Sequence, residues 1–134
     1  MEIFRTFLKN KQTKIMSTLI VNLNVSPGNV DASLNPNPVT ISWDASMTSK
    51  NNNPISIELN ILPDSPVFFV SSDNKNVKTV FWTQDFNEGF DSYTDDLFIN
   101  VTQPQPEREA TKVRIDIVDS TGFKSSRNCI LMYK

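Results

Sequence analysis

The sequence predicts an all-β protein built as a two-sheet antiparallel β-sandwich. Apolar and polar residues alternate with a period of two through most of the chain after residue 18. Turn signals recur about every 8–12 residues, and no segment of this region has the pattern of a long amphipathic helix. A chain of 134 residues has the usual size of one domain with one core.

The first half of the chain predicts three strands. Residues 19–25 alternate cleanly, and the Pro-Gly pair within residues 26–29 predicts a turn. A short strand is expected at 30–34. Two prolines within 35–38 exclude that stretch from a central strand, because each proline removes a ladder donor. Alternation resumes at 39–43.

The second half predicts more short strands and one long loop. Residues 55–61 show the cleanest alternation in the chain, and 67–70 and 77–82 are short apolar strands. Residues 85–96 are expected to form a loop, and 97–101 restart the alternation. Together with the closing hairpin described next, this predicts seven to nine short strands, the pattern of a sandwich or barrel.

The chain ends in a predicted hairpin. Residues 113–117 alternate, 119–122 form the turn with Gly122 at a left-handed position, and 123–133 return. The predicted core consists of the inward positions of all these strands: Leu19, Val21, Leu23, Val39, Ile41, Trp43, Ile55, Ile57, Leu59, Ile99, Val101, Val113, Ile115, Ile117 and Leu131.

Residues 1–15 differ from the domain predicted over 16–134. Apolar residues recur there at roughly helical spacing with basic residues between them, as a short basic amphipathic extension. Three interpretations remain open: a helix that docks on the body or a partner, a peripheral membrane anchor, or a mis-called start with Met16 as the true first residue. Four basic residues against Glu2 give this segment a net charge of +3. Since the whole chain has a net charge of −2, residues 16–134 carry −5.

The composition excludes several classes of catalyst. The chain has no histidine and one cysteine, so we expect no histidine-dependent nucleophile, no common zinc site and no disulfide. No phosphate-cradling glycine loop or nucleophile elbow is present. We expect no enzymatic activity and no cofactor, apart from the calcium considered below. Cys129 lies in an apolar run and is expected to be a small buried hydrophobe.

Charge and hydropathy limit the partners and the compartment. An acidic body gives no electrostatic argument for nucleic acid and argues against an anionic membrane. The N-terminus lacks the features of a secretory signal, and no apolar run reaches the length of a membrane span. We therefore expect a cytoplasmic protein by default, while export by another route stays open.

Two stretches resemble a known group of domains. Residues 38–44 (PVTISWD), with the Trp43-Asp44 pair, and the closing segment 113–122 (VRIDIVDSTG) are similar to bacterial immunoglobulin-like and PKD-type β-sandwich domains. They cover about a fifth of the chain, and Ala45-Ser46-Met47 stands where that group usually has Gly-Asp-Gly. The resemblance implies an immunoglobulin-like sandwich with a spacing or adhesion role.

The segment 85–96 is the candidate metal site. Calcium takes six to eight oxygen ligands, often from flexible loops. Six residues offer such oxygens: Asp85, Asn87, Glu88, Asp91, Asp95 and Asp96. A solvated acidic loop explains the same pattern without a metal.

Aromatic residues form the candidate partner surface. Adjacent aromatics on a strand point to opposite faces, so one of each pair faces away from the main core. The residues expected to offer this surface are Phe68, Trp82, Phe86, Phe90 and Tyr93. Coverage by another segment is the alternative.

These observations favour a structural or protein-interaction module that self-associates through edge strands and aromatic surface, as a homo-oligomer. The alternative is a calcium-assisted carbohydrate-binding module that uses the 85–96 segment, with Tyr93 and Trp82 for sugar stacking.

Overall fold

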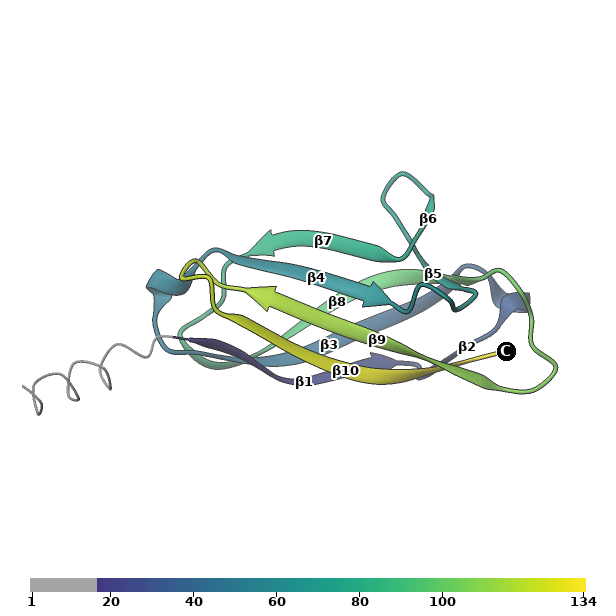
Figure 1. The fold of residues 1–134 in the computed structure, drawn as a ribbon, viewed down its shortest axis with the longest axis horizontal. Coiled ribbons are helices and arrows are strands. Elements are labelled where there is room, and N and C mark those ends of the chain that lie inside the picture. Colours follow the sequence, from purple (N-terminus) through teal and green to yellow (C-terminus); the bar gives the residue numbers. More distant parts are fainter. Residues whose placement is uncertain (1–16) are drawn as a thin grey trace, which may run out of the picture.

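The computed structural model describes residues 17–134, which form two packed five-stranded sheets (Figure 1). Sheet 1 has the order β1 (Thr18–Ser26), β3 (Asn37–Met47), β8 (Gly89–Val101), β5 (Val67–Val70) and β6 (Asn76–Val77). Sheet 2 has the order β2 (Asn29–Val30), β10 (Lys124–Tyr133), β9 (Glu109–Val118), β4 (Ile55–Ile61) and β7 (Thr79–Gln84). The predicted all-β, two-sheet sandwich is confirmed.

Three details of the prediction are wrong. Residues 35–38 are not excluded from a central strand, because β3, which lies between β1 and β8, already includes Asn37 and Pro38. The pairings are antiparallel except that of β2 with β10, which is parallel. The strand expected at 30–34 ends at Val30, because the Asp31 side chain accepts a hydrogen bond from the Ser33 N–H and caps the 3₁₀ turn Ala32–Leu34.

The described residues contain no α-helix, and the second 3₁₀ turn is Lys50–Asn52. None of their helical segments is long and apolar enough to cross a membrane. The predicted extension at residues 1–15 lies outside the described part of the chain.

The core lies between the sheets and contains most of the predicted residues. Trp43 is 1% exposed, and Ile41, Ile57 and Ile115 are fully buried. The closing hairpin is also as predicted, because Gly122 has φ +88° and its N–H donates to the Asp119 carbonyl. The strand periodicity therefore identified the inward face correctly in β3, β4, β8 and β9.

Strand β1 breaks the alternation, and there the core prediction fails. The pairing of β1 with β3 shifts between Ile20 and Asn22, which leaves Val21 as the extra residue of a β-bulge. A bulge changes which residues face inward, so Ile20 is buried before it, whereas Leu19 (44%) and Val21 (38%) are exposed. Leu23, after the bulge, is partly buried against the core.

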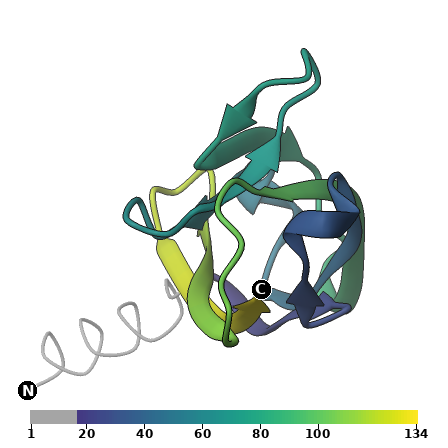
Figure 2. The same ribbon diagram turned by 90° about the vertical axis from the view of Figure 1, so that its right-hand side faces the viewer.

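The bulge lies on a closed side of the sandwich. There the Ile20 N–H donates to Ser125 Oγ at 3.1 Å, and the Arg127 Nε donates to the Val21 carbonyl at 3.3 Å. Side chains of β10 therefore satisfy edge backbone groups of β1. Figure 2 looks along the sandwich and shows β1 and β10 together on one side, with the β5–β6 hairpin projecting from the body elsewhere.

The opposite long side is open. Strand β5 pairs with β6 on one side and, on the other, with only the last part of β8, through Val67, Phe68 and Phe69. Residues 89–97 of β8 therefore have no described strand beyond them on that side. Strand β7 is the terminal strand of sheet 2 and pairs only with β4. We call β7 together with residues 89–97 of β8 the open side.

The change of inward residues in β1 predicts unequal effects of two neighbouring substitutions. Ile20→Ala should lower the free energy of unfolding by about 2–5 kcal/mol, because it empties a fully buried site. Leu19→Ala should cost about 1 kcal/mol or less. Urea denaturation measures both, and equal losses would contradict the placement of the bulge.

Candidate functional site

Half-exposed apolar side chains line the open side. Val80 and Trp82 of β7, with Tyr93 and Leu97 of β8, are partly buried and pack against the core. Their positions face inward, as the pairing of Tyr93 with the buried Trp43 shows. The core is therefore less well covered here than on the side closed by β1 and β10.

A cluster of four aromatic residues connects the two sheets at the open side. The Trp43 ring centroid lies 6.0 Å from that of Trp82 and 6.1 Å from that of Tyr93. The Phe86 ring stacks on Tyr93 at 4.5 Å with an interplanar angle of 22°. Trp82 belongs to sheet 2 and Trp43 to sheet 1, so the cluster packs the two sheets against each other at the open side.

Hydrogen bonds fix the short connection between β7 and β8. The Phe86 N–H donates to Asn53 Oδ1 at 2.8 Å, and Asn53 Nδ2 donates to the Phe86 carbonyl at 2.9 Å. The Asn87 N–H donates to the Tyr93 hydroxyl at 2.8 Å. Asn53 and Tyr93 therefore both hold this connection in place, and Phe86 is buried in the core with 3% of its surface exposed.

Strand β7 presents an unprotected edge. Its sequence, TVFWTQ, contains no proline, no glycine and no charge, the features that commonly blunt edge strands. Outward-facing Phe81 is 63% exposed. A six-residue strand rich in β-branched and aromatic residues with one free edge is a template for pairing with another strand.

The structure brings three of the five predicted surface residues together, namely Trp82, Phe86 and Tyr93. Phe86 is buried, so its expected place on a surface is wrong. Phe68 lies on β5 under the Lys78 ammonium, 3.8 Å from its ring centroid. Phe90 is 66% exposed on β8.

Phe81 is the residue that the sequence interpretation missed. Of the Phe81-Trp82 pair, the sequence interpretation assigns Trp82 to the surface, but Trp82 packs inward against the core. The alternation of Thr79, Phe81 and Thr83 against Val80 and Trp82 carries the signal for the outward face.

The predicted acidic loop at 85–96 is a loop only as far as residue 88, because β8 begins at Gly89 with φ +91°. Asp85, Asn87 and Glu88 lie in the connection, while Asp91, Asp95 and Asp96 lie on β8. Asp95 and Asp96 are neighbours on a strand and therefore point to opposite faces. Asp96 accepts a hydrogen bond from Thr40 Oγ1 at 2.8 Å.

Asp91 Oδ2 accepts a hydrogen bond from Asn87 Nδ2 at 2.5 Å. Over residues 17–134 the structure gathers no group of three or more acidic or thiol side chains able to hold a metal ion together. Calcium binding therefore stays a prediction, without a preassembled set of ligands in the described region.

The carboxylates of β8 have opposite electrostatic environments. Burial raises the pKa of Asp95, and the charge of Asp96 adds to the effect. Hydrogen bonds from the Asn87 side chain and the Ser92 N–H lower the pKa of Asp91. Asp95, which faces inward opposite the buried Ile41, is thus a charge that the fold disfavours at the open side.

The Cys129 thiol lies on β10, where burial raises its pKa to about 11. A thiol with this pKa is almost entirely protonated at neutral pH, so it is a poor nucleophile.

Comparisons with known proteins relate the chain to others through its fold. No protein-family model and no curated protein sequence matches it. The alkylpurine DNA glycosylase AlkC of Pseudomonas fluorescens, bound to DNA containing an abasic site analog, superposes with a TM-score of 0.52 at 11% identity, over 87% of this chain and 30% of AlkC. This chain thus spans 30% of the length of AlkC, and the likeness shows the fold alone.

Two further structures are less similar. A conjugative transposon lipoprotein from Bacteroides eggerthii has a TM-score of 0.49 at 10% identity, covering 88% of this chain and 97% of the lipoprotein. The periplasmic chaperone SfaE has a TM-score of 0.42 at 10% identity, covering 84% of this chain and 56% of the chaperone.

The two environments on β8 predict stability changes of opposite sign. The ordinary pKa of both carboxyls is 3.8. Asp95 has a raised pKa in the folded state, so its charge costs stability above that pKa, and the cost disappears as the pH falls to 3.8. Asp95→Asn should therefore raise the melting temperature at neutral pH, and this gain should shrink on acidification.

Asp91→Asn is the matched comparison. The lowered pKa of Asp91 means that its charge stabilises the fold above 3.8, so removing the charge should lower the melting temperature at neutral pH. Thermal melts across the acidic range measure both variants. A loss of stability in Asp95→Asn that does not depend on pH would contradict the environment assigned to Asp95.

Proposed function

We propose that this chain is a non-enzymatic protein-interaction module that self-associates through its open side, with β7 of one copy pairing with β7 of a second copy. The observation that carries the proposal is the contrast between the two edges. Side chains of β10 form hydrogen bonds to backbone groups of β1, whereas within the described chain β7 has a free edge and contains no charged residue and no proline. Pairing two copies satisfies the backbone groups of both edges.

An antiparallel arrangement is favoured by symmetry and by charge. A two-fold axis perpendicular to the sheet makes two identical edge strands antiparallel and keeps both cores on the same face of the joined sheet, so the Thr79 end of one β7 lies beside the Gln84 end of the other. Lys78 precedes the first end, and Asp85 and Glu88 follow the second. Each basic end therefore meets the partner's acidic end, which gives two such contacts in the dimer and favours a second copy as the occupant of this edge.

The β5–β6 hairpin marks one limit of the shared edge. It projects from the body near the start of β7 (Figure 1). A partner strand that lies along β7 is therefore bounded at that end, and the pairing is confined to about the six residues Thr79–Gln84. The exposed Phe81 side chains of the two copies add apolar contact on the outer face.

The finer classification of the fold is part of the same proposal. The Trp43-Asp44 strand and the closing hairpin support an immunoglobulin-like sandwich, a group whose members act in spacing and adhesion. The absence of histidine from the sequence and the raised pKa of the Cys129 thiol support a role without catalysis.

A charge on the outer face of β7 tests the proposed dimer. Phe81→Lys should convert a dimer into a monomer, because the two-fold axis brings like charges together at the paired edge. Phe98→Lys is the control, since Phe98 is 50% exposed on β8 away from the proposed edge and should leave the dimer intact. Size-exclusion chromatography with light scattering, across a range of protein concentrations, measures the mass.

Two results would contradict the proposal: a wild-type chain that is monomeric at every concentration, or a dimer that Phe98→Lys dissociates and Phe81→Lys does not. The second result would move the interface to the outer face of sheet 1.

A further inference from the structure

A basic groove of about 430 Å³ lies on sheet 2, where β4, β7, β9 and β10 meet the connections that follow β4 and precede β7. Arg114 of β9 lies opposite Asn60 of β4 on one side and Asn128 of β10 on the other. The groove is lined by Asn60, Ile61, Leu62, Pro63, Lys78, Thr79, Lys112, Arg114 and Asn128. Its volume falls within the range of small-molecule sites.

The charge of the groove is opposite to that of the body. Lys78, Lys112 and Arg114 line it, and none of its lining residues is acidic. The chain outside its first 15 residues carries a net negative charge. Arg114 is paired with Asp116, so Lys78 and Lys112 supply the excess positive charge, which favours an anionic ligand over a neutral or cationic one.

Asp116 holds the guanidinium of Arg114 in place. Asp116 faces the outside of sheet 2 but is 6% exposed, because its neighbours cover it. Its Oδ2 accepts hydrogen bonds from Arg114 Nε at 2.9 Å and Asn60 Nδ2 at 3.3 Å, and its Oδ1 accepts one from Ser126 Oγ. The Arg114 side chain stays 51% exposed, and its terminal nitrogens bond no residue within 17–134.

Lys112 and Asn128 supply further unused donors. Neither the Lys112 ammonium nor the Asn128 amide has a salt bridge or side-chain hydrogen bond to the part of the chain that the structure describes. Lys78 differs, because its ammonium donates to the carbonyls of Ser65 (2.5 Å) and Val67 (2.6 Å). Lys78 therefore contributes charge and an apolar stem rather than a free donor.

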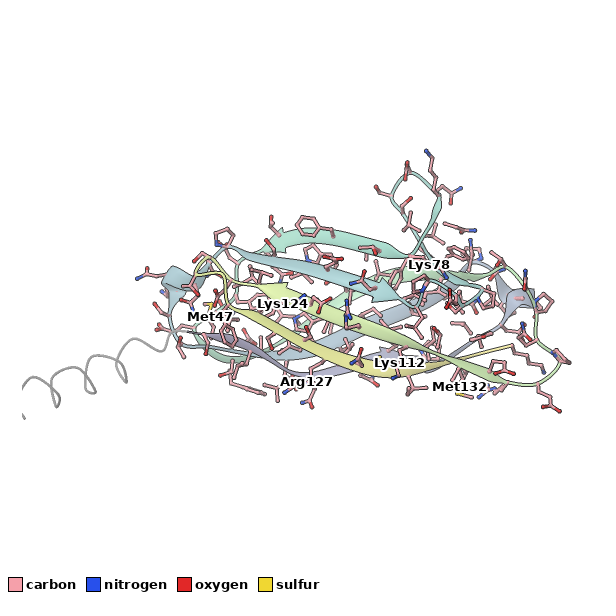
Figure 3. All side chains as sticks on the ribbon, viewed as in Figure 1. Met47, Lys78, Lys112, Lys124, Arg127 and Met132 are labelled. Atoms are coloured by element: carbon pink, nitrogen blue, oxygen red, sulfur yellow. The ribbon has the colours of Figure 1, made fainter. Side chains whose placement is uncertain are left out.

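The groove also has an apolar part. Leu62 is 48% exposed beside Pro63, and the buried Ile61 lies next to them in the chain. Figure 3 shows Lys78, in the bend between β6 and β7, and Lys112, on β9, toward the same end of the sandwich, with Lys124 and Arg127 farther toward the other end. The free donors and the apolar residues thus share one groove at that end.

We propose that this groove binds a small organic oxyanion, with its carboxylate or phosphate group on Arg114, Lys112 and Asn128 and its apolar body against Leu62 and Pro63. A guanidinium held by a buried carboxylate presents its terminal N–H groups in a fixed plane, which suits two oxygens of one anion. The ammonium and the amide add donors to the same group. This site goes beyond the proposed self-association, because its free donors lie on β9 and β10 and not on the β7 edge.

Titration followed by NMR of the Asn128 side-chain amide and the Arg114 Nε–H tests the proposal with four probes: phenyl phosphate, benzoate, inorganic phosphate and benzyl alcohol. We expect saturable shifts of both signals with phenyl phosphate or benzoate, and the tighter of the two identifies the preferred head group. Inorganic phosphate should bind more weakly than phenyl phosphate because it lacks the apolar body, and neutral benzyl alcohol should produce no saturable shift.

Three variants connect the shifts to the groove. Lys112→Gln and Asn128→Ala leave the Arg114–Asp116 pair in place, so the fold should be retained, and Lys112→Gln should weaken the binding of the preferred probe about tenfold. In Asn128→Ala the Arg114 signal reports the binding. Lys124→Gln, which removes an exposed lysine outside the groove, is the control and should change binding less than about twofold.

Several results would overturn the proposal: no saturable shift with any of the anions, equal weakening by Lys124→Gln and Lys112→Gln, or benzyl alcohol binding as well as the anions. Inorganic phosphate that binds as tightly as phenyl phosphate would overturn the organic ligand. The oligomeric state of the same samples shows independently whether the proposed self-association holds.

Discussion

The aromatic cluster of Trp43, Trp82, Tyr93 and Phe86 is the contact on which the open side of the fold depends. A tryptophan-sized side chain buries about 200 Å² and contributes several kcal/mol through burial, and each aromatic pair adds about 0.5–1.5 kcal/mol. The buried Trp43 Nε1 has no hydrogen-bond partner in the described region, which costs about 1–3 kcal/mol. Packing of the rings thus outweighs an unsatisfied donor.

The two long sides of the sandwich differ in how the unpaired backbone groups of their edge strands are covered. On one side a β-bulge in β1 turns Ile20 into the core, and Ser125 and Arg127 of β10 bond the edge backbone. On the other side β5 is too short to cover residues 89–97 of β8, and side-chain packing replaces backbone pairing. Hydrogen bonds therefore close one side of the sandwich, whereas on the open side aromatic rings pack the two sheets together and the β7 edge stays free.

Periodicity predicted most of the fold because one buried face constrains each strand strongly. Trp43 and the apolar positions of β4 and β9 are buried as expected. Leu19 and Val21 are not, because the bulge depends on the pairing of β1 with β3, which no local pattern reveals. Likewise, the polarity of the acidic residues after Gly89 predicts a loop, but β8 pairs with β3 along this whole stretch. The site was predicted only in part. To decide whether Phe81 or Trp82 is on the surface, one must know which face of β7 points into the core, and only the pairing of β7 with β4 shows this.

Hydrogen exchange of the β7 backbone amides, compared between dilute and concentrated protein, tests the account most directly. The outward-directed amides of an unpaired edge exchange quickly, and pairing with a second copy protects them. The account predicts that protection of residues 79–84 rises with concentration while that of β1 stays constant. Protection of β7 that does not depend on concentration, or a concentration-dependent change confined to β1, would contradict it.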